Sequence, residues 1–98
     1  MLPPDVLDRI IRDFPAADAA AAAAALEQLQ EHEPEVFSLR LIRCAVHLSK
    51  GQFLALGEWI VKARADWRDV IRAAEFDRGD RRLRNFDEPF EGAPAPAG

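Results

Sequence analysis

Apolar residues recur along most of this chain with the spacing of an α-helix, and no segment shows the alternation of a β-strand. The first apolar stripe contains Val6, Ile10 and Phe14, and the proline that follows Phe14 ends that helix. An alanine-rich run comes next. It predicts a second helix over residues 16–32, because alanine has the highest intrinsic helix propensity. These two elements already indicate an all-α protein.

Residues 35–49 predict a third helix that is apolar around most of its circumference. Its basic residues fall within an arc of about 80° on a helical projection. They are Arg40, Arg43, His47 and Lys50. A helix with so few polar positions must be covered on several sides, so we expect it to be the central element of the fold. Gly51 is expected to take the left-handed conformation that commonly follows the last turn of a helix.

Two more helices are predicted, one over residues 52–64 and one from Asp66 onward. The first is apolar on a wide face that includes Phe53 and Leu56. Gly57 lies inside it at a cost of about 1 kcal/mol relative to alanine, which indicates a close crossing with another helix. Asp66 is a favourable N-cap for the last helix. In that helix the pattern directs one set of side chains inward (Trp67, Val70, Ile71, Ala74) and another outward (Arg68, Arg72, Glu75).

The sequence therefore predicts a compact all-α bundle of about five short helices in residues 1–84. An extended, partly disordered C-terminal tail is predicted over residues 85–98. The end of this tail is rich in glycine, alanine and proline, which is typical of an unstructured terminus. Phe86 and Phe90 are large apolar residues near its start, and they can let that part of the tail lie across the bundle.

Charge is distributed unevenly along the 98 residues. Residues 1–35 contain eight acidic residues and two arginines, a net charge of −6. Residues 36–84 contain eleven basic and six acidic residues, a net charge of +5. These opposite charges favour internal pairing between the two parts of the chain. The alternative is a basic face on the third helix that binds an anionic partner, although the overall net charge of −4 argues against a dedicated nucleic-acid binder.

Cysteine content and hydropathy indicate where the protein acts. A single cysteine, Cys44, excludes an internal disulfide and is typical of a reducing compartment. The chain does not start with a basic segment followed by an apolar run, and it contains no apolar stretch of the length that spans a bilayer. We therefore expect a cytoplasmic protein that does not enter the membrane.

No group of residues has a pattern typical of catalysis, metal binding or cofactor binding. Cys44 and His47 are three residues apart, but Cys44 lies on the apolar side of the third helix and His47 lies in the basic arc. A buried core thiol beside a surface histidine is therefore the favoured interpretation. The acidic residues around His32 point in different directions and have no second ligand cluster, which predicts a solvated helix end. We expect no enzyme activity, no metal, no cofactor and no small-molecule substrate.

Two segments of the chain resemble a known group of proteins. They are Leu48-Ser49-Lys50-Gly51 and the stretch from Ala63 to Phe76, which contains Asp66-Trp67-Arg68-Asp69-Val70. They resemble a family of small uncharacterised bacterial all-helical proteins that combine a Lys-Gly turn, a helix and a closing Asp-(Trp/Tyr)-Arg-Asp-(Val/Leu) segment. The resemblance covers roughly a third of the chain. It implies a small helical fold and a bacterial origin, and it implies no activity, because no function is established for that family.

The third and fourth predicted helices together carry more apolar surface than the remaining short helices can cover. The residues expected to stay exposed lie on the fourth helix and are Leu54, Trp59 and Val61. A patch of this kind usually marks a surface for a partner, unless Phe86 and Phe90 cover it. We expect a non-enzymatic interaction module that self-associates or docks a protein partner through this patch. The alternative function is a small regulator that binds nucleic acid through the basic face of the third helix.

Overall fold

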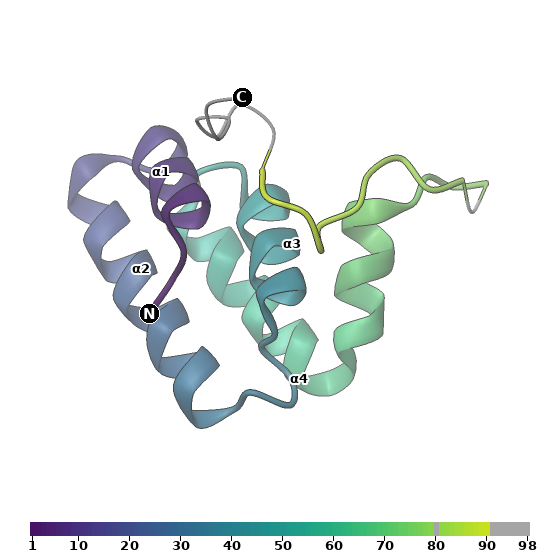
Figure 1. Ribbon diagram of the computed structural model, residues 1–98, viewed down its shortest axis with the longest axis horizontal. Coiled ribbons are helices and arrows are strands. Elements are labelled where there is room, and N and C mark those ends of the chain that lie inside the picture. The colour runs from purple at the N-terminus through teal and green to yellow at the C-terminus, as the bar shows by residue number, and fades with distance from the viewer. Residues whose placement is uncertain (80, 91–98) are drawn as a thin grey trace.

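The computed structural model describes residues 1–79 and 81–90, and within them it contains four α-helices and no β-strand (Figure 1). The helices are α1 (Pro4–Asp13), α2 (Ala16–His32), α3 (Leu39–Ser49) and α4 (Phe53–Glu75). In Figure 1, α3 lies between the pair formed by α1 and α2 and the second half of α4. The predicted all-α fold is confirmed. The disorder predicted for the end of the tail falls on residues 91–98, which lie outside the described residues.

The prediction that the third helix is the central element is confirmed. Residues 41–46 of α3 are all buried, and Leu41, Ile42 and Val46 have no exposed surface. The buried core that contains these residues also includes residues of each of the other helices: Val6 and Ile10 of α1, Ala22 and Leu26 of α2, and Leu56, Ala63 and Val70 of α4. Alanine at position 22 lets α2 pack closely, and Leu26 fills the space one turn later.

Helix α3 begins at Leu39, four residues later than the sequence predicted. The hydroxyl of Ser38 accepts a hydrogen bond from the backbone N–H of Leu41 at 3.2 Å, so Ser38 is the N-cap. Before it, the backbone N–H of Phe37 donates to the carbonyl of Glu33 at 2.9 Å and closes a turn. This turn buries Phe37, which is only 1% exposed. The capping serine therefore sets the start of the helix, although the apolar pattern extends further toward the N-terminus.

The predicted fourth and fifth helices are the two halves of one bent helix, α4. Asp66 has extended backbone angles inside it (φ −158°, ψ 101°). The carboxylate of Asp66 accepts a hydrogen bond from the backbone N–H of Arg68 at 3.1 Å, so it caps the second half as predicted. No loop separates the two halves. The prediction of about five helices is therefore wrong in number, and the described residues contain four.

Three side chains of α4 lie differently from the sequence pattern. The pattern directs Glu75 outward, but its side chain has no exposed surface, because it is surrounded by hydrogen-bond donors from α3 and from residues 82–86. The pattern directs Phe53 and Trp67 inward, but each is 40% exposed. Phe53 is the first residue of α4, and Trp67 directly follows the bend at Asp66. Fewer neighbouring side chains surround a residue at such an end.

Gly51 and Gly57 lie in opposite kinds of environment. Gly51 has a φ of +78°, and a Cβ atom there would overlap the backbone carbonyl of Asp13. The predicted left-handed turn is thus confirmed, and it begins one residue earlier at Lys50, with a φ of 50°. A Cβ atom on Gly57 would meet no other atom within 4 Å. Within residues 1–79 and 81–90 the predicted close helix crossing at Gly57 is therefore wrong, because no other helix among them covers this side of α4.

These two environments predict opposite effects for the same substitution. We expect Gly57→Ala to stabilise the fold by about 0.5–1 kcal/mol, because alanine is the better helix former and has free space there. We expect Gly51→Ala to destabilise it by more than about 1 kcal/mol, because a side chain disfavours the left-handed conformation and the Asp13 carbonyl must move. Urea unfolding measures both effects. Midpoint shifts of the same sign in the two variants would contradict this assignment.

Candidate functional site

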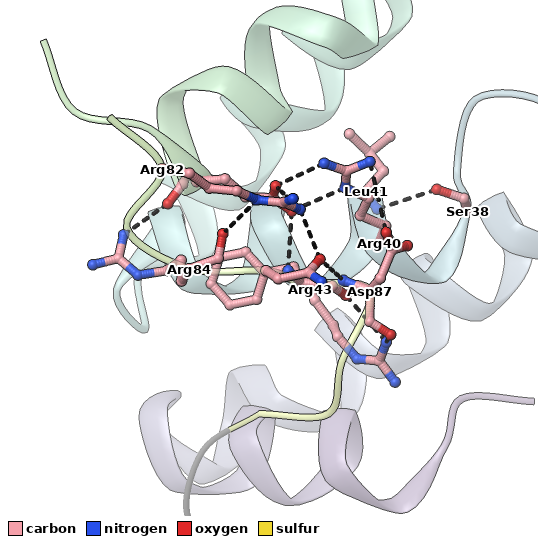
Figure 2. Close-up of polar contacts among 11 residues, drawn as sticks. Ser38, Arg40, Leu41, Arg43, Arg82, Arg84 and Asp87 are labelled. Carbon is pink, nitrogen blue, oxygen red and sulfur yellow. Dashed lines mark hydrogen bonds and ion pairs between the residues drawn. The ribbon is translucent and has the colours of Figure 1, made fainter. Parts of the chain in front are cut away.

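Three of the four predicted basic residues, Arg40, Arg43 and His47, lie against the C-terminal segment. This segment, residues 81–90, crosses α3 and is yellow-green in Figure 1. Arg43 is only 6% exposed. Its Nε and Nη2 donate hydrogen bonds to the carboxylate of Asp5 at 3.0 and 3.3 Å. Its Nη1 donates to the backbone carbonyls of Phe86 and Asp87 at 3.2 and 3.3 Å (Figure 2). Arg43 therefore links α1, α3 and the C-terminal segment to one another.

Asp5 is the second point of attachment for this segment. Its carboxylate accepts a hydrogen bond from the backbone N–H of Phe90 at 3.2 Å, in addition to those from Arg43. Burial acts to raise the pKa of Asp5, but the hydrogen bonds from Arg43 and Phe90 and the charge of Arg43 outweigh burial, and the pKa lies below 3.8. Asp5 is thus a paired anion at neutral pH.

Glu75 is the third point of attachment, at the end of α4. Arg40 donates to both of its carboxylate oxygens, with Nε–Oε2 at 2.9 Å and Nη2–Oε1 at 2.7 Å. Arg82 and the backbone N–H of Phe86 also donate to it, at 2.9 and 3.0 Å (Figure 2). Burial acts to raise the pKa of Glu75, but these hydrogen bonds and the charge of Arg40 lower it below 4.5. The carboxylate therefore joins α3, α4 and the C-terminal segment.

His47 is half-buried on the same side of α3. Its ring centroid lies 5.2 Å from that of Phe86. Burial lowers the pKa of His47 below 6.5, and the positive charges of Arg84, Arg9 and Lys50 lower it further. The imidazole is therefore mainly neutral at pH 7. Lys50, the last of the four predicted basic residues, is exposed at the end of the helix.

The environment of His47 gives a measurable expectation. An NMR titration is expected to give an imidazole pKa below 6.5, and Arg84→Gln is expected to raise this pKa by removing one of the neighbouring cations. Because the pKa is lowered in the folded state, His47 supports folding fully above pH 6.5, and its contribution declines as pH falls below that value. A titrated pKa above 6.5 would contradict this placement of the ring.

The structure thus uses the charges of α3 mainly for internal contacts. Arg43 pairs with Asp5 of the acidic N-terminal part, and Arg64 of α4 pairs with Glu33, with 2.7 Å between Nη2 and Oε2. These two contacts agree with the internal charge pairing favoured from the sequence. Arg40, Arg43, His47 and Lys50 remain on one side of α3, but the C-terminal segment covers Arg43 and contacts Arg40 and His47. They do not form a free basic face.

The C-terminal segment packs on the bundle through the two phenylalanines that the sequence singled out. Phe86 and Phe90 are 6% and 5% exposed, and their ring centroids are 5.6 Å apart. The guanidinium of Arg9 lies 4.7 Å from the centre of the Phe90 ring. The packed part of the chain therefore extends to residue 90 and does not end at residue 84. The two rings contact side chains of α1 and α3, and they leave Leu54 and Val61 of α4 exposed.

The first half of α4 carries the predicted apolar patch. Leu54 is 83% exposed and Val61 is 67% exposed, and the two residues lie two turns apart on one line of the helix. Trp59 is half-buried. A hollow of about 380 Å³ lies beside Val61, and its lining residues are Ala55, Glu58, Trp59, Val61 and Lys62. We call the surface formed by Leu54, Gly57, Glu58, Val61 and Lys62 the α4 face.

Cys44 and the acidic residues give no support for catalytic or metal chemistry. Cys44 is fully buried, as predicted for a core residue, and burial together with the charge of Glu75 raises its pKa to about 12. Its thiol therefore stays protonated at neutral pH and is a poor nucleophile. Within residues 1–79 and 81–90, no three His, Cys, Asp or Glu side chains lie where they could hold one metal ion.

Sequence reasoning did not identify Asp5 and Glu75 as structurally important residues. For Asp5 the sequence gives only a local signal, a negative charge in the first turn of a helix, where such a charge is favourable. Glu75 was predicted to point outward because it is charged, although it lies one turn after Ile71, which was predicted to point inward; the helical spacing from Ile71 was therefore the available signal. That signal was outweighed by the usual exposure of glutamate.

Comparison of the chain with protein-family models, with curated proteins and with solved structures finds no match. The resemblance to small bacterial helical proteins therefore stays a prediction. In the part of the chain that the structure describes, no helix is both long and apolar enough to cross a membrane.

Proposed function

We propose that this protein is a non-enzymatic interaction module that docks a protein chain through the α4 face. The observation that supports this proposal is the exposure of Leu54 and Val61 on one line of a helix, next to a hollow. The C-terminal segment carries Phe86 and Phe90, which could have covered the α4 face, but these two rings pack against α1 and α3. We further propose that the protein acts in the bacterial cytoplasm, in keeping with its single cysteine, which is buried.

The free energy gained when a partner covers the α4 face is large enough to contribute to binding. Burying one fully exposed leucine or valine side chain contributes about 1.5–3 kcal/mol. Exposed apolar patches with polar residues at their edge are typical of protein-binding surfaces. Glu58 and Lys62 supply such an edge on one side of the α4 face. The half-buried Trp59 adds a rigid aromatic wall, a residue type that is common in the centre of interfaces.

A crosslinking experiment in the cell tests the proposal. A photoreactive amino acid is placed at Leu54 or at Val61, and the matched control carries it at Ala20, an exposed residue of α2. We expect discrete covalent adducts with protein from the two α4 positions and at most a weak background from position 20. Equal adduct yields from all three positions, or no adducts, would contradict a docking role for the α4 face.

The nucleic-acid alternative has less support. Phosphate binding needs free cationic side chains, and it weakens steeply as salt is added. Arg40 and Arg43 are already bound to carboxylates and to backbone carbonyls. We expect titration with a mixed-sequence DNA duplex, or with single-stranded RNA, to show no binding above the background of an acidic protein. Salt-sensitive binding that Lys50→Glu abolishes would favour the alternative.

A further inference from the structure

We infer that the occupant of the α4 face is a second copy of this chain, packed as an antiparallel α4–α4 pair about a two-fold axis. This inference rests on the proposed function and specifies the partner. It follows from the order of charges along α4, from the open space at Gly57 and from the hollow beside Val61.

The order of charges makes the α4 face complementary to itself. Glu58 and Lys62 are one turn apart on the same flank of the line that joins Leu54 to Val61. In a two-fold antiparallel pair, each flank of a helix meets the same flank of its partner in reverse order. An axis between Glu58 and Trp59 places Leu54 of each copy within one turn of Val61 of the other, and Glu58 of each copy within one turn of Lys62 of the other. Because side chains tilt toward the N-terminus of their own helix, Glu58 and Lys62 of the partner tilt toward each other, whereas the two Glu58 side chains tilt apart. A parallel pair would place this flank against the opposite one and lose both ion pairs.

Both charges are available for such a contact. In the described part of the chain, Glu58 and Lys62 form no ion pair with each other or with any other residue. The Lys62 ammonium lies 5.1 Å from the centre of the Trp59 ring, so its side chain runs along the edge of the hollow. A lysine in this position can reach a carboxylate of a second chain without leaving the tryptophan surface.

Gly57 provides the space for the second helix. Gly57 lies on the flank of the Leu54–Val61 line that is opposite Glu58 and Lys62. A Cβ atom there would meet no atom of the described residues within 4 Å. A small residue at an exposed helix position lets a second helix approach closely at the crossing point. The hollow beside Val61 is open to the Leu54 side chain of the partner. The open space at Gly57 and the hollow beside Val61 can thus receive the apolar side chains of a second helix. Leu54 and Val61 of a second α4 have the spacing that this requires.

The size of the contact sets its strength. Two helix faces of this length bury less than the roughly 1,600 Å² of a standard interface. We therefore expect a weak, concentration-dependent dimer, with a dissociation constant in the micromolar range or above.

Sedimentation equilibrium over a range of concentrations at low salt tests the inference. We expect the wild type to dimerise. Glu58→Lys and Lys62→Glu each replace two attractive contacts with repulsive ones, so each is expected to weaken dimerisation by about tenfold or more. The double variant Glu58→Lys/Lys62→Glu restores opposite charges in the pair and is expected to recover most of the wild-type affinity. Glu31→Lys, an exposed change on α2, is the matched control and should leave affinity unchanged.

The outcomes separate the inference from the proposed function. A wild type that stays a single copy at millimolar concentration overturns the second copy as the occupant. Weakening in both single variants without recovery in the double variant overturns the antiparallel arrangement. In either case, crosslinks from Leu54 to a different protein would leave the docking role of the α4 face intact. Crosslinked adducts of twice the chain mass support the inference. Val61→Lys is expected to abolish both the dimer and those adducts.

Discussion

Glu75→Gln is expected to lower the free energy of unfolding by about 3–5 kcal/mol, a large part of what a domain of this size has. The substitution keeps the shape of the side chain but removes its charge. It leaves the guanidinium groups of Arg40 and Arg82 without the carboxylate that both of them bind. The change is costly because Arg40, Arg82 and the backbone N–H of Phe86 all lose a charged acceptor at once. Denaturant unfolding measures the loss.

Glu88→Gln is the matched control, because Glu88 is exposed and belongs to the same segment. We expect it to change stability by less than about 0.5 kcal/mol. The pH dependence offers a second test. The pKa of Glu75 is lower in the folded chain, so its contribution is complete above pH 4.5 and is lost as pH falls through the folded-state value. In Glu75→Gln this part of the acid sensitivity should disappear. Equal stability of the two variants would contradict the role assigned to Glu75.

Arg43→Met is expected to have a similar cost, also about 3–5 kcal/mol. Methionine fills much of the same volume but donates no hydrogen bond. The carboxylate of Asp5 then loses its counter-charge, and the carbonyls of Phe86 and Asp87 lose their donor. Arg12→Met is the matched control, because the Arg12 side chain is 63% exposed and its pairing with Asp13 lies at the surface.

A double-mutant cycle shows whether Arg43 acts through Asp5. The combination of Arg43→Met with Asp5→Asn should cost less than the sum of the two single changes, with a coupling of about 0.5–3 kcal/mol. The reason is that the single change at position 43 leaves a buried anion, whereas the double change leaves a neutral amide. Strict additivity, or an Arg43→Met variant as stable as Arg12→Met, would contradict the linking role of this arginine.

The features of the fold that depend on local sequence were predictable. Residues 41–46 lie in a run that is apolar on nearly all sides, and this placed α3 at the centre. Asp66 is a capping residue in front of an amphipathic stretch, and Gly51 follows the last turn of α3. In each case the signal lies within a few residues of the feature it specifies.

The features that depend on distant residues were not predictable. Glu75 is buried because Arg40, 35 residues earlier, donates to it, and Asp5 is paired because Arg43, 38 residues later, donates to it. A single sequence does not show which residues meet in space, so a charged side chain is expected at the surface by default. The close helix crossing predicted at Gly57 was wrong for a related reason. A glycine inside a helix indicates a close contact, but it does not show whether the contact is with the same chain or with another one.

The candidate surface was predictable in part. The excess of apolar residues on two neighbouring helices indicated that Leu54 and Val61 stay exposed, and both are exposed. Trp59 lies partly in the interior, so it acts as a wall of the hollow and does not protrude from the patch. The basic residues of α3 were a plausible alternative surface only while the position of Phe86 and Phe90 was unknown. Once the C-terminal segment lies over α3, those cations have internal partners.

The central claim is that residues 81–90 cover α3 and leave the α4 face open in the single chain. Solvent paramagnetic relaxation, measured by NMR with a soluble gadolinium chelate on a dilute sample that sedimentation shows to be a single copy, tests both halves of this claim at once. The account predicts strong relaxation of the Leu54 and Val61 methyl groups and weak relaxation of the Phe86 and Phe90 ring protons. Strong relaxation of both phenylalanine rings, or protected methyl groups at positions 54 and 61, would contradict it.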